Sequence, residues 1–384
     1  MSGPVRGSVA VVGAAESDLG RVADHMTPVD LMAQAVTRAL AEAGLTLKEV
    51  DGLFATSSQV RMGPLALSEY LGLRPRYFEG TNIGGSSFQS YVAHAHAAIE
   101  AGLCSVAVIA YGSTQRSVSR SAAAPREYNA YETAYRPILP TSAYALAAAR
   151  HMHDYGTTRE QLAEVAVAAR QCALLNPKAW ENEPLTIAEV LSSRMVSSPL
   201  TVRDCCLVTD GGGALVLVSA KRARDLPVTP VYVLGHGQAL EHMSISSMAD
   251  LTETGAARSG PPAFAMSGTR PADMDVTILY DAFTITPILF LEDLGYCAKG
   301  EGGAFVSGGA IAPEGRLALN TNGGGLSYCH PGMYGLLGMI EAVRQLRGEC
   351  GARQQEGARL ALSHGNGGVL SSQCTVVFGT AETL

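Results

Sequence analysis

Residues 319–335 read Leu-Asn-Thr-Asn-Gly-Gly-Gly-Leu-Ser-Tyr-Cys-His-Pro-Gly-Met-Tyr-Gly. Three consecutive glycines, Gly323–Gly325, allow the backbone to pass close to a ligand or to another strand. The apolar residues of 333–347 follow the spacing of an amphipathic helix that ends at Gly348. The stretch therefore predicts a glycine turn that carries His330 to the start of a helix, as in α/β folds that direct side chains into a crevice.

The composition bounds the class of protein. The chain has 384 residues, of which 47% are hydrophobic and 16% charged, and it contains 42 glycines. A chain of this length buries one large core or two medium ones, and this composition is typical of a compact enzyme. The net charge of -7 argues against nucleic acid as the main partner, although a local basic patch and helix N-termini still hold anionic substrates.

Cysteine usage and hydropathy indicate the compartment. The eight cysteines show no CxxC pairing and no regular spacing, so the sequence indicates neither a metal site nor a disulfide framework. The N-terminus lacks the apolar core of a secretory signal, and no apolar run approaches the ~18 residues that a membrane-spanning helix needs. We therefore expect a protein of the reducing cytoplasm that has no membrane partner.

The first part of the chain alternates strand and helix patterns. Strands are predicted at 8–13, 50–55 and 105–111, and helices at 28–45, 65–73 and 87–101. The last of these helices is rich in alanine, which predicts that it packs closely between two sheets.

Residues 113–157 are irregular and rich in Ser, Arg, Pro and Tyr, with a short helix near 143–153. They are interpreted as a loop insertion over the body, and such long insertions are usually functional. A helix at 159–175 follows. Residues 201–219 resemble a pair of apolar strands with a glycine corner.

The pattern then starts again, which predicts a duplicated α/β unit. A strand at 228–234 opens the second unit. In this second unit, residues 274–283 correspond to the strand at 50–55, and the helix at 333–347 corresponds to the alanine-rich helix at 87–101. Residues 359–378 correspond to the apolar stretch that ends at residue 219. The predicted halves are 1–227, which contains the insertion at 113–157, and 228–384.

Four sequence blocks resemble the thiolase superfamily. They are Asn82-Ile-Gly-Gly-Ser-Ser-Phe at a helix start, Tyr280-Asp-Ala-Phe where thiolases carry Asn-Glu-Ala-Phe, Cys329-His-Pro-Gly-Met-Tyr-Gly, which is similar to Gly-His-Pro-x-Gly-x-x-Gly, and His364-Gly-Asn-Gly-Gly where thiolases carry Cys-x-Gly-Gly-Gly. With Asp210-Gly-Gly-Gly they span nearly the whole chain in order. The resemblance implies a five-layered αβαβα fold of two duplicated halves, usually dimeric, that binds coenzyme A thioesters.

The departures from the thiolase pattern decide the chemistry. Thiolases carry their acylated cysteine where this chain has Gly85, and their second catalytic cysteine where it has His364. A glycine forms no acyl-enzyme, so acyl transfer by the usual route is excluded. Ser86 or Ser87 is interpreted either as a substitute nucleophile or as a helix cap. Empty space in place of the nucleophile is expected to enlarge the pocket near the thioester.

This pattern is similar to a thiolase-like subgroup called lipid-transfer proteins, which includes steroid side-chain aldolases. The resemblance implies an acyl-CoA lyase that performs a retro-aldol cleavage of a β-hydroxyacyl-CoA through a thioester enolate. Coenzyme A is then part of the substrate, with no covalently bound cofactor. The resemblance also implies a homodimer and a small partner protein of the OB-fold and zinc-ribbon (DUF35) type. Two alternatives stay open, namely thiolase-type acyl transfer and a non-catalytic acyl-CoA or lipid carrier.

The expected catalytic residues are Tyr280, Tyr328, His330 and His364. Tyr280 or Tyr328 removes the proton of the β-hydroxyl, His330 and backbone amides of the glycine turns stabilise the enolate, and His364 or the second tyrosine protonates the α carbon. A tyrosine near its ordinary pKa of ~10 is a poor base, so this role requires a lowered pKa. The alternative for each of these tyrosines is a packed structural side chain.

The expected substrate-binding residues are Gly85, Ser86, Gly324, Gly325, Tyr334 and Asn366. The phosphates of coenzyme A require basic contacts, and the candidates are Arg116, Arg120 and Arg126 in the predicted insertion. A solvated charged surface is the alternative reading of these arginines.

Overall fold

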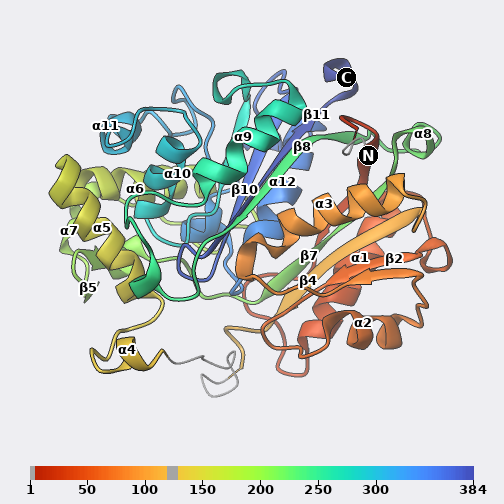
Figure 1. Ribbon diagram of the computed structural model, residues 1–384, viewed down its shortest axis with the longest axis horizontal. Coiled ribbons are helices and arrows are strands. Elements are labelled where there is room, and N and C mark those ends of the chain that lie inside the picture. Colours follow the sequence, from red (N-terminus) through yellow and green to blue (C-terminus); the bar gives the residue numbers. More distant parts are fainter. Residues whose placement is uncertain (1–4, 119–128) are drawn as a thin grey trace.

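The computed structural model describes residues 5–118 and 129–384. Within them, nine strands form one mixed sheet in the order β3-β2-β4-β7-β1-β8-β11-β10-β9 (Figure 1). Their bounds are β1 Val9–Glu16, β2 Gly52–Ala55, β3 Tyr77–Glu79, β4 Val106–Ser113, β7 Gly211–Ser219, β8 Val231–Leu240, β9 Val276–Leu279, β10 Leu360–Gly367 and β11 Ser372–Gly379. A separate pair consists of β5 Met195–Ser197 and β6 Leu200–Thr201.

Helices cover and divide this sheet. Their bounds are α1 Pro28–Glu42, α2 Gly63–Leu71, α3 Ser87–Glu100, α4 Ala130–Thr133, α5 Thr141–Tyr155, α6 Arg159–Leu174, α7 Ile187–Ser192, α8 Ala220–Ala223, α9 Ala256–Ser267, α10 Ile285–Asp293, α11 Gly302–Val306 and α12 Gly335–Leu346. None of the described helices combines the length and apolarity that crossing a bilayer requires.

The strands pair in the same pattern from each outer edge toward the middle. β2 runs parallel to β4, β4 is antiparallel to β7, and β7 is antiparallel to β1. Likewise β9 is parallel to β10, β10 is antiparallel to β11, and β11 is antiparallel to β8. The two sets meet where β1 pairs with β8. A division at residues 227/228 stays a prediction, and it would fall between α8 and β8.

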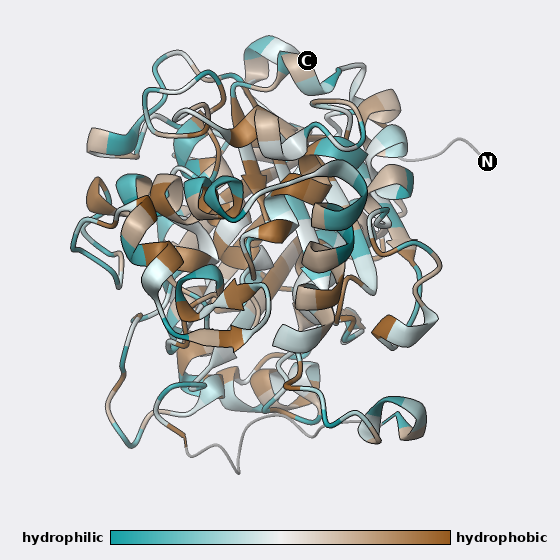
Figure 2. Ribbon diagram, turned by 90° about the vertical axis from the view of Figure 1, so that its left-hand side faces the viewer, coloured by the Kyte–Doolittle hydropathy of each residue, from teal (hydrophilic) through white to brown (hydrophobic). Residues whose placement is uncertain are grey.

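The helix packing gives five layers. α1 packs on β1, β4 and β7, and α9 packs on β8 and β11, whereas α3 and α12 contact strands of both sets. Both central helices are mostly buried, as the alanine-rich sequence of α3 predicts. Glycines permit the close approach of the outer helices, because a Cβ at Gly13 would lie 2.2 Å from the carbonyl oxygen of Ala39, and one at Gly235 would lie 2.1 Å from that of Ala263. Figure 2 shows hydrophobic segments gathered in the middle of the molecule.

Two parts of the sequence interpretation were wrong. The predicted pair of strands at 201–219 contributes only β7 to the main sheet, because Leu200–Thr201 pairs with β5 and Val202–Asp204 forms a 3-10 turn. The helix α9 was not predicted. It contains Pro261 and Pro262, which a sequence reading takes as helix breakers. Within the predicted insertion, α4 and α5 form, and Arg120 and Arg126 lie outside the described residues.

Candidate active site

Tyr280 and His330 form a buried pair. Tyr280 follows β9 and His330 follows the turn at 324–328. A hydrogen bond of 3.0 Å joins the Tyr280 hydroxyl to Nε2 of His330. The backbone N–H of Tyr334 donates to the same hydroxyl, also at 3.0 Å. The structure therefore brings together three residues that the sequence predicted from two separate blocks.

The backbone holds both members of this pair in place. The N–H of Tyr280 donates to the carbonyl oxygen of His364 in β10 at 3.1 Å, which continues the pairing of β9 with β10. The N–H of His330 donates to Oγ1 of Thr209 at 3.0 Å, and the N–H of Thr209 donates back to the His330 carbonyl at 3.3 Å. Neither side chain depends on a free loop for its position.

Burial keeps both groups neutral near pH 7. It lowers the pKa of His330 to about 4 and raises the pKa of Tyr280 well above its usual value. This shift is opposite in direction to the one that a tyrosine base alone needs. Because the Tyr280 oxygen already accepts the N–H of Tyr334, its own proton is available to Nε2 of His330. The hydrogen bond thus gives a proton a direct path from phenol to imidazole, along which both pKa shifts make the transfer uphill.

The prediction of empty space at position 85 is wrong. A Cβ placed on Gly85 would lie 2.2 Å from Cε2 of the Tyr280 ring and 2.7 Å from the carbonyl oxygen of Asn366. The tyrosine ring therefore occupies the space next to the backbone where a side chain of residue 85 would begin. Gly85 does not have a positive φ, so space and not backbone conformation requires a glycine here.

The backbone amides of the glycine turn bind the carboxylate of Asp281. The N–H of Gly325 donates to Oδ1 of Asp281 at 2.6 Å, and the N–H of Leu326 donates to Oδ2 at 3.3 Å. The N–H of Gly325 is thus occupied by Asp281, and the role of Gly324 and Gly325 in holding an enolate stays a prediction. Sequence reasoning missed Asp281, although its place beside Tyr280 was visible.

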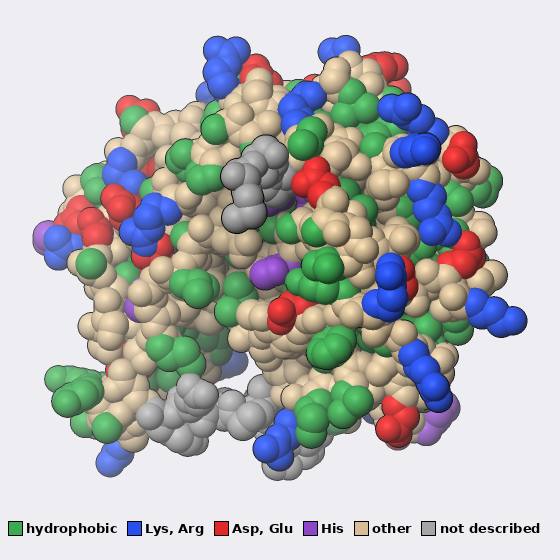
Figure 3. All heavy atoms as spheres, turned by 45° about the vertical axis from the view of Figure 1, so that its right-hand side comes forward, with side chains coloured by type: hydrophobic (Ala, Val, Ile, Leu, Met, Phe, Trp, Pro, Cys, Tyr) green, Lys and Arg blue, Asp and Glu red, His purple; other side chains and the backbone are tan. Residues whose placement is uncertain are grey.

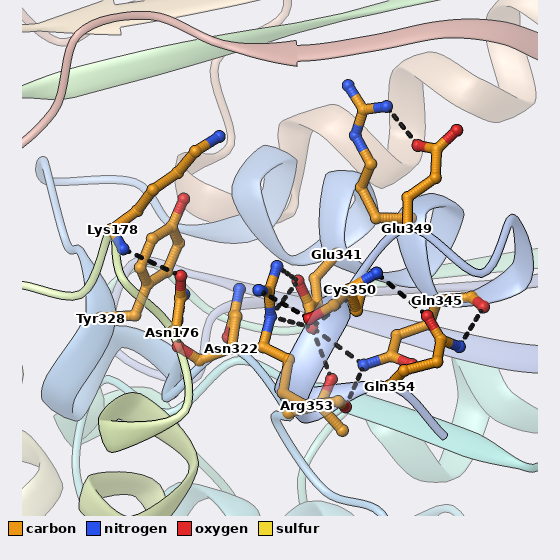
Figure 4. Close-up of polar contacts among 12 residues, drawn as sticks. Asn176, Lys178, Asn322, Tyr328, Glu341, Gln345, Glu349, Cys350, Arg353 and Gln354 are labelled. Carbon is orange, nitrogen blue, oxygen red and sulfur yellow. Dashed lines mark hydrogen bonds and ion pairs between the residues drawn. The ribbon is translucent and has the colours of Figure 1, made fainter. Parts of the chain in front are cut away.

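Tyr328 points away from the pair. Its hydroxyl donates to Glu16 at 3.2 Å, and Glu16 also forms an ion pair of 3.0 Å with Lys178, which lies beside Tyr328 in Figure 4. Burial and the nearby Glu16 carboxylate raise the pKa of Tyr328 well above its usual value. Figure 4 also shows Glu341 of α12 beside Arg353, with which it forms an ion pair of 2.9 Å. These contacts favour the structural alternative for Tyr328.

His364 has both ring nitrogens occupied. Nδ1 bonds Oγ1 of Thr375 at 2.9 Å, and Nε2 bonds Oε1 of Gln373 at 2.8 Å. Burial lowers the pKa of His364 to about 3. Gln373 in turn donates to Asn366, whose amide donates to the hydroxyl of Tyr144 at 2.8 Å. The side chains of His364 and Asn366 therefore belong to a buried chain of hydrogen bonds that includes neither the Tyr280 hydroxyl nor the His330 ring, and His364 meets Tyr280 through its backbone carbonyl alone.

Neither the serine nor the neighbouring thiol is poised for attack. Oγ of Ser86 lies 2.6 Å from Oγ of Ser372, which donates to the carbonyl of Ile83. Cys329 precedes His330, but its sulfur lies 3.1 Å from Oγ1 of Thr209, and burial raises its pKa to about 12. A serine nucleophile needs an adjacent base, which these contacts do not supply.

A cavity of about 490 Å³ opens beside the turn. Its floor includes Leu326 and Ser327, and its walls carry three arginines and one glutamate beside an indole: Arg116, Arg170, Arg203, Glu181 and Trp180. The guanidinium of Arg116 lies 4.3 Å from the centre of the Trp180 ring. The cavity thus combines excess positive charge with an aromatic surface. Of these residues, the sequence analysis named only Arg116.

One face of the molecule is mixed in charge. Figure 3 shows Lys and Arg side chains interspersed with Asp and Glu over one face.

Comparison with known proteins places the chain. Residues 237–380 match the family described as "Thiolase C-terminal domain-like". The chain is 35% identical over 364 residues to the "Steroid side-chain-cleaving aldolase" of Thermomonospora curvata, covering 89% of this chain and 91% of that one. It is 34% identical over 361 residues to "17-hydroxy-3-oxo-4-pregnene-20-carboxyl-CoA lyase" of Mycobacterium tuberculosis, covering 89% and 92%.

A solved structure shows the same fold. The "Ltp2-ChsH2(DUF35) aldolase" superposes with a TM-score of 0.88 at 32% identity, covering 99% of this chain and 100% of that chain. This match confirms the predicted thiolase-like fold class. The chain therefore belongs to the thiolase superfamily, among members similar to the steroid side-chain-cleaving aldolases.

Proposed function

We propose that this chain is an aldolase-type lyase that cleaves the bond between the α and β carbons of a β-hydroxyacyl-CoA. The observation that carries the proposal is the neutral Tyr280–His330 pair, which stands where residue 85 offers no nucleophile. The names of the two relatives, an aldolase and a carboxyl-CoA lyase, support this class of reaction and a steroid side chain as the acyl group.

The proton transfers balance without a covalent intermediate. As the β-hydroxyl gives its proton to the Tyr280 oxygen, the phenol proton moves to Nε2 of His330. The α–β carbon bond breaks, the β carbon leaves as a carbonyl, and its electron pair forms the thioester enolate. The His330 imidazolium offsets the enolate charge and then returns its proton through Tyr280 to the α carbon. Proton transfer by a positioned side chain contributes ~10²–10⁴-fold to a rate.

We place the coenzyme A part of the substrate in the arginine-lined cavity. Guanidinium groups pair with phosphate oxygens, and an indole face suits a nucleobase. The cavity wall is joined to the reacting pair, because the N–H of Cys206 in the wall donates to the carbonyl of Ala282 at 2.8 Å, two residues after Tyr280.

Arg203→Ala is expected to raise KM for an acyl-CoA by about tenfold and to leave kcat within about twofold, because the loss of one phosphate contact weakens binding by ~1.4 kcal/mol. Arg203 suits this test because the one ion pair that it forms with the described residues, with Glu181, is long at 3.5 Å. Steady-state kinetics would measure the change. The control is Arg270→Ala, because Arg270 is exposed and lies outside the cavity lining. An equal KM in the unmodified protein and in both variants would contradict the placement of coenzyme A in this cavity.

We propose two kinds of protein contact. Edge strand β3 and helix α2 expose apolar side chains, Phe78, Leu65, Met62 and Tyr70, which favours a homodimer formed at this edge. The solved relative is a complex with a DUF35 protein, which supports a small OB-fold and zinc-ribbon partner for this chain. The described cysteines are all free, which fits a cytoplasmic enzyme. Light scattering and co-purification test the two assemblies.

The function is tested by incubating the purified chain, with and without a co-expressed DUF35-type partner, with a panel of β-hydroxyacyl-CoAs. The expected result is a free aldehyde or ketone together with a shortened acyl-CoA, detected by mass spectrometry. Saturable binding without product under every combination would support the carrier alternative. A labelled acyl-enzyme that Ser86→Ala removes would support acyl transfer.

A further inference from the structure

Asp281 takes no part in the proton transfers above, yet it is one of the most enclosed ionisable groups of the site. Its side chain is 1% exposed and follows directly after Tyr280. Its two oxygens accept the N–H groups of Gly325 and Leu326, the start of the turn that leads to His330. A buried carboxylate that binds backbone amides fixes the conformation of the segment that carries them.

This turn is in contact with His330. A Cβ at Gly325 would lie 3.0 Å from Cδ2 of the His330 ring, and one at Gly324 would lie 1.9 Å from Oδ2 of Asp281. Carboxylate, turn and imidazole are therefore packed without a gap. Tyr280 binds the imidazole directly while Asp281 binds the backbone beside it, so two successive residues hold His330 from two sides.

We propose that Asp281 is a positioning residue for the lyase reaction: its ionised carboxylate holds the turn that places His330 against Tyr280, and its protonation weakens that hold. This inference rests on the function proposed above. Asp281 does not itself touch the reacting atoms.

The surroundings of Asp281 determine the pH range. Groups that face it are Cys172 of α6, Cys206 and Tyr334, and burial raises the pKa of each of them, for Cys172 to about 12, so they carry no charge near pH 7. Burial raises the pKa of Asp281 to about 7, against the opposing effect of hydrogen bonds from the backbone of Gly325, Leu326 and Asp281 itself and from the Asn320 side chain. Below that pH the Asp281 carboxyl is protonated and accepts the N–H groups of Gly325 and Leu326 less strongly. Above that pH the ionised carboxylate accepts both N–H groups fully. Activity is therefore expected to rise with pH through about 7.

The test is the pH profile of Asp281→Asn. The variant is expected to lower kcat by roughly 10- to 100-fold, since small misplacements of reacting groups cost up to ~10²-fold, to keep KM within about twofold, and to lose the acid limb near pH 7. Asp275→Asn is the matched control, because Asp275 also accepts two backbone N–H groups, from Arg359 and Leu360, outside this site. An unchanged kcat, or an acid limb that persists in Asp281→Asn, would overturn the proposal.

A second measurement on the unmodified protein does not depend on turnover or on the folding of the variant. Infrared spectra are expected to show a protonated carboxyl band that disappears as the pH rises through about 7, and the histidine NMR signal of His330 is expected to shift with the same midpoint. A band that titrates near ~4, the ordinary range of an aspartate, or a His330 signal that ignores this transition, would refute the coupling. If no acyl-CoA is cleaved, the proposed function fails, while this result still decides the link from Asp281 to His330.

Discussion

Tyr280→Phe is expected to lower kcat for acyl-CoA cleavage by roughly a thousandfold, within the ~10²–10⁴-fold that a positioned proton donor and acceptor contributes. The substitution keeps the ring that fills the space beside Gly85 and removes only the oxygen that joins His330 to the N–H of Tyr334. KM is expected to change little, because the arginine-lined cavity is untouched. Rapid-quench kinetics with a cleavable β-hydroxyacyl-CoA measures the effect.

Tyr296→Phe is the matched control. Its hydroxyl bonds Thr277 at 2.8 Å, so this variant also removes a buried phenol bond, but one that does not touch the reacting pair. Both variants are expected to lose ~1–3 kcal/mol of stability, and only Tyr280→Phe is expected to lose the rate. Equal rates in the two variants would dismiss the role assigned to the Tyr280 hydroxyl.

Gly85→Ala is expected to have the second-largest effect, with kcat reduced by ~10²-fold and a stability loss of ~1–3 kcal/mol. The reason is steric: the added methyl would stand 2.2 Å from the Tyr280 ring, so the phenol must move away from His330. Thermal unfolding and steady-state kinetics measure the two losses.

A double-mutant cycle separates the ring from its surroundings. In a Tyr280→Asn background the alanine at 85 is expected to cost less stability than in the wild type, although the carbonyl of Asn366, 2.7 Å from the new Cβ, keeps part of the cost. Additive losses would mean that the ring and residue 85 do not compete for the same space.

Particular residues show which features of the fold and the site can be predicted from the sequence. The four ordered blocks predicted the fold class, and the glycine turn with its following helix predicted where His330 would lie. The same blocks named Tyr280 and His330 as separate candidates, and their direct hydrogen bond became known only from the structure. The spacing of apolar residues predicts which helices and strands pack together, and it therefore predicts where a residue at the end of such an element lies.

Side-chain direction is what spacing does not determine. Tyr328 and His364 lie in segments adjacent to Tyr280 and His330. The side chain of Tyr328, however, turns toward Glu16, and that of His364 turns toward Thr375 and Gln373. The space left by the missing nucleophile was filled by a ring from a segment almost two hundred residues away, which no local pattern reveals. The arginine-lined cavity likewise gathers residues from helix α6 and from several segments far apart in the sequence.

The central claim is that a phenol–imidazole pair breaks a carbon–carbon bond by proton transfer alone. The most direct test is a single-turnover reaction with a β-hydroxyacyl-CoA in the absence of free coenzyme A, followed by product analysis. The account predicts one carbonyl compound and one shortened acyl-CoA in equal amounts, while the protein keeps its unmodified mass. Cleavage that requires added coenzyme A and leaves an acyl group on the protein would contradict it.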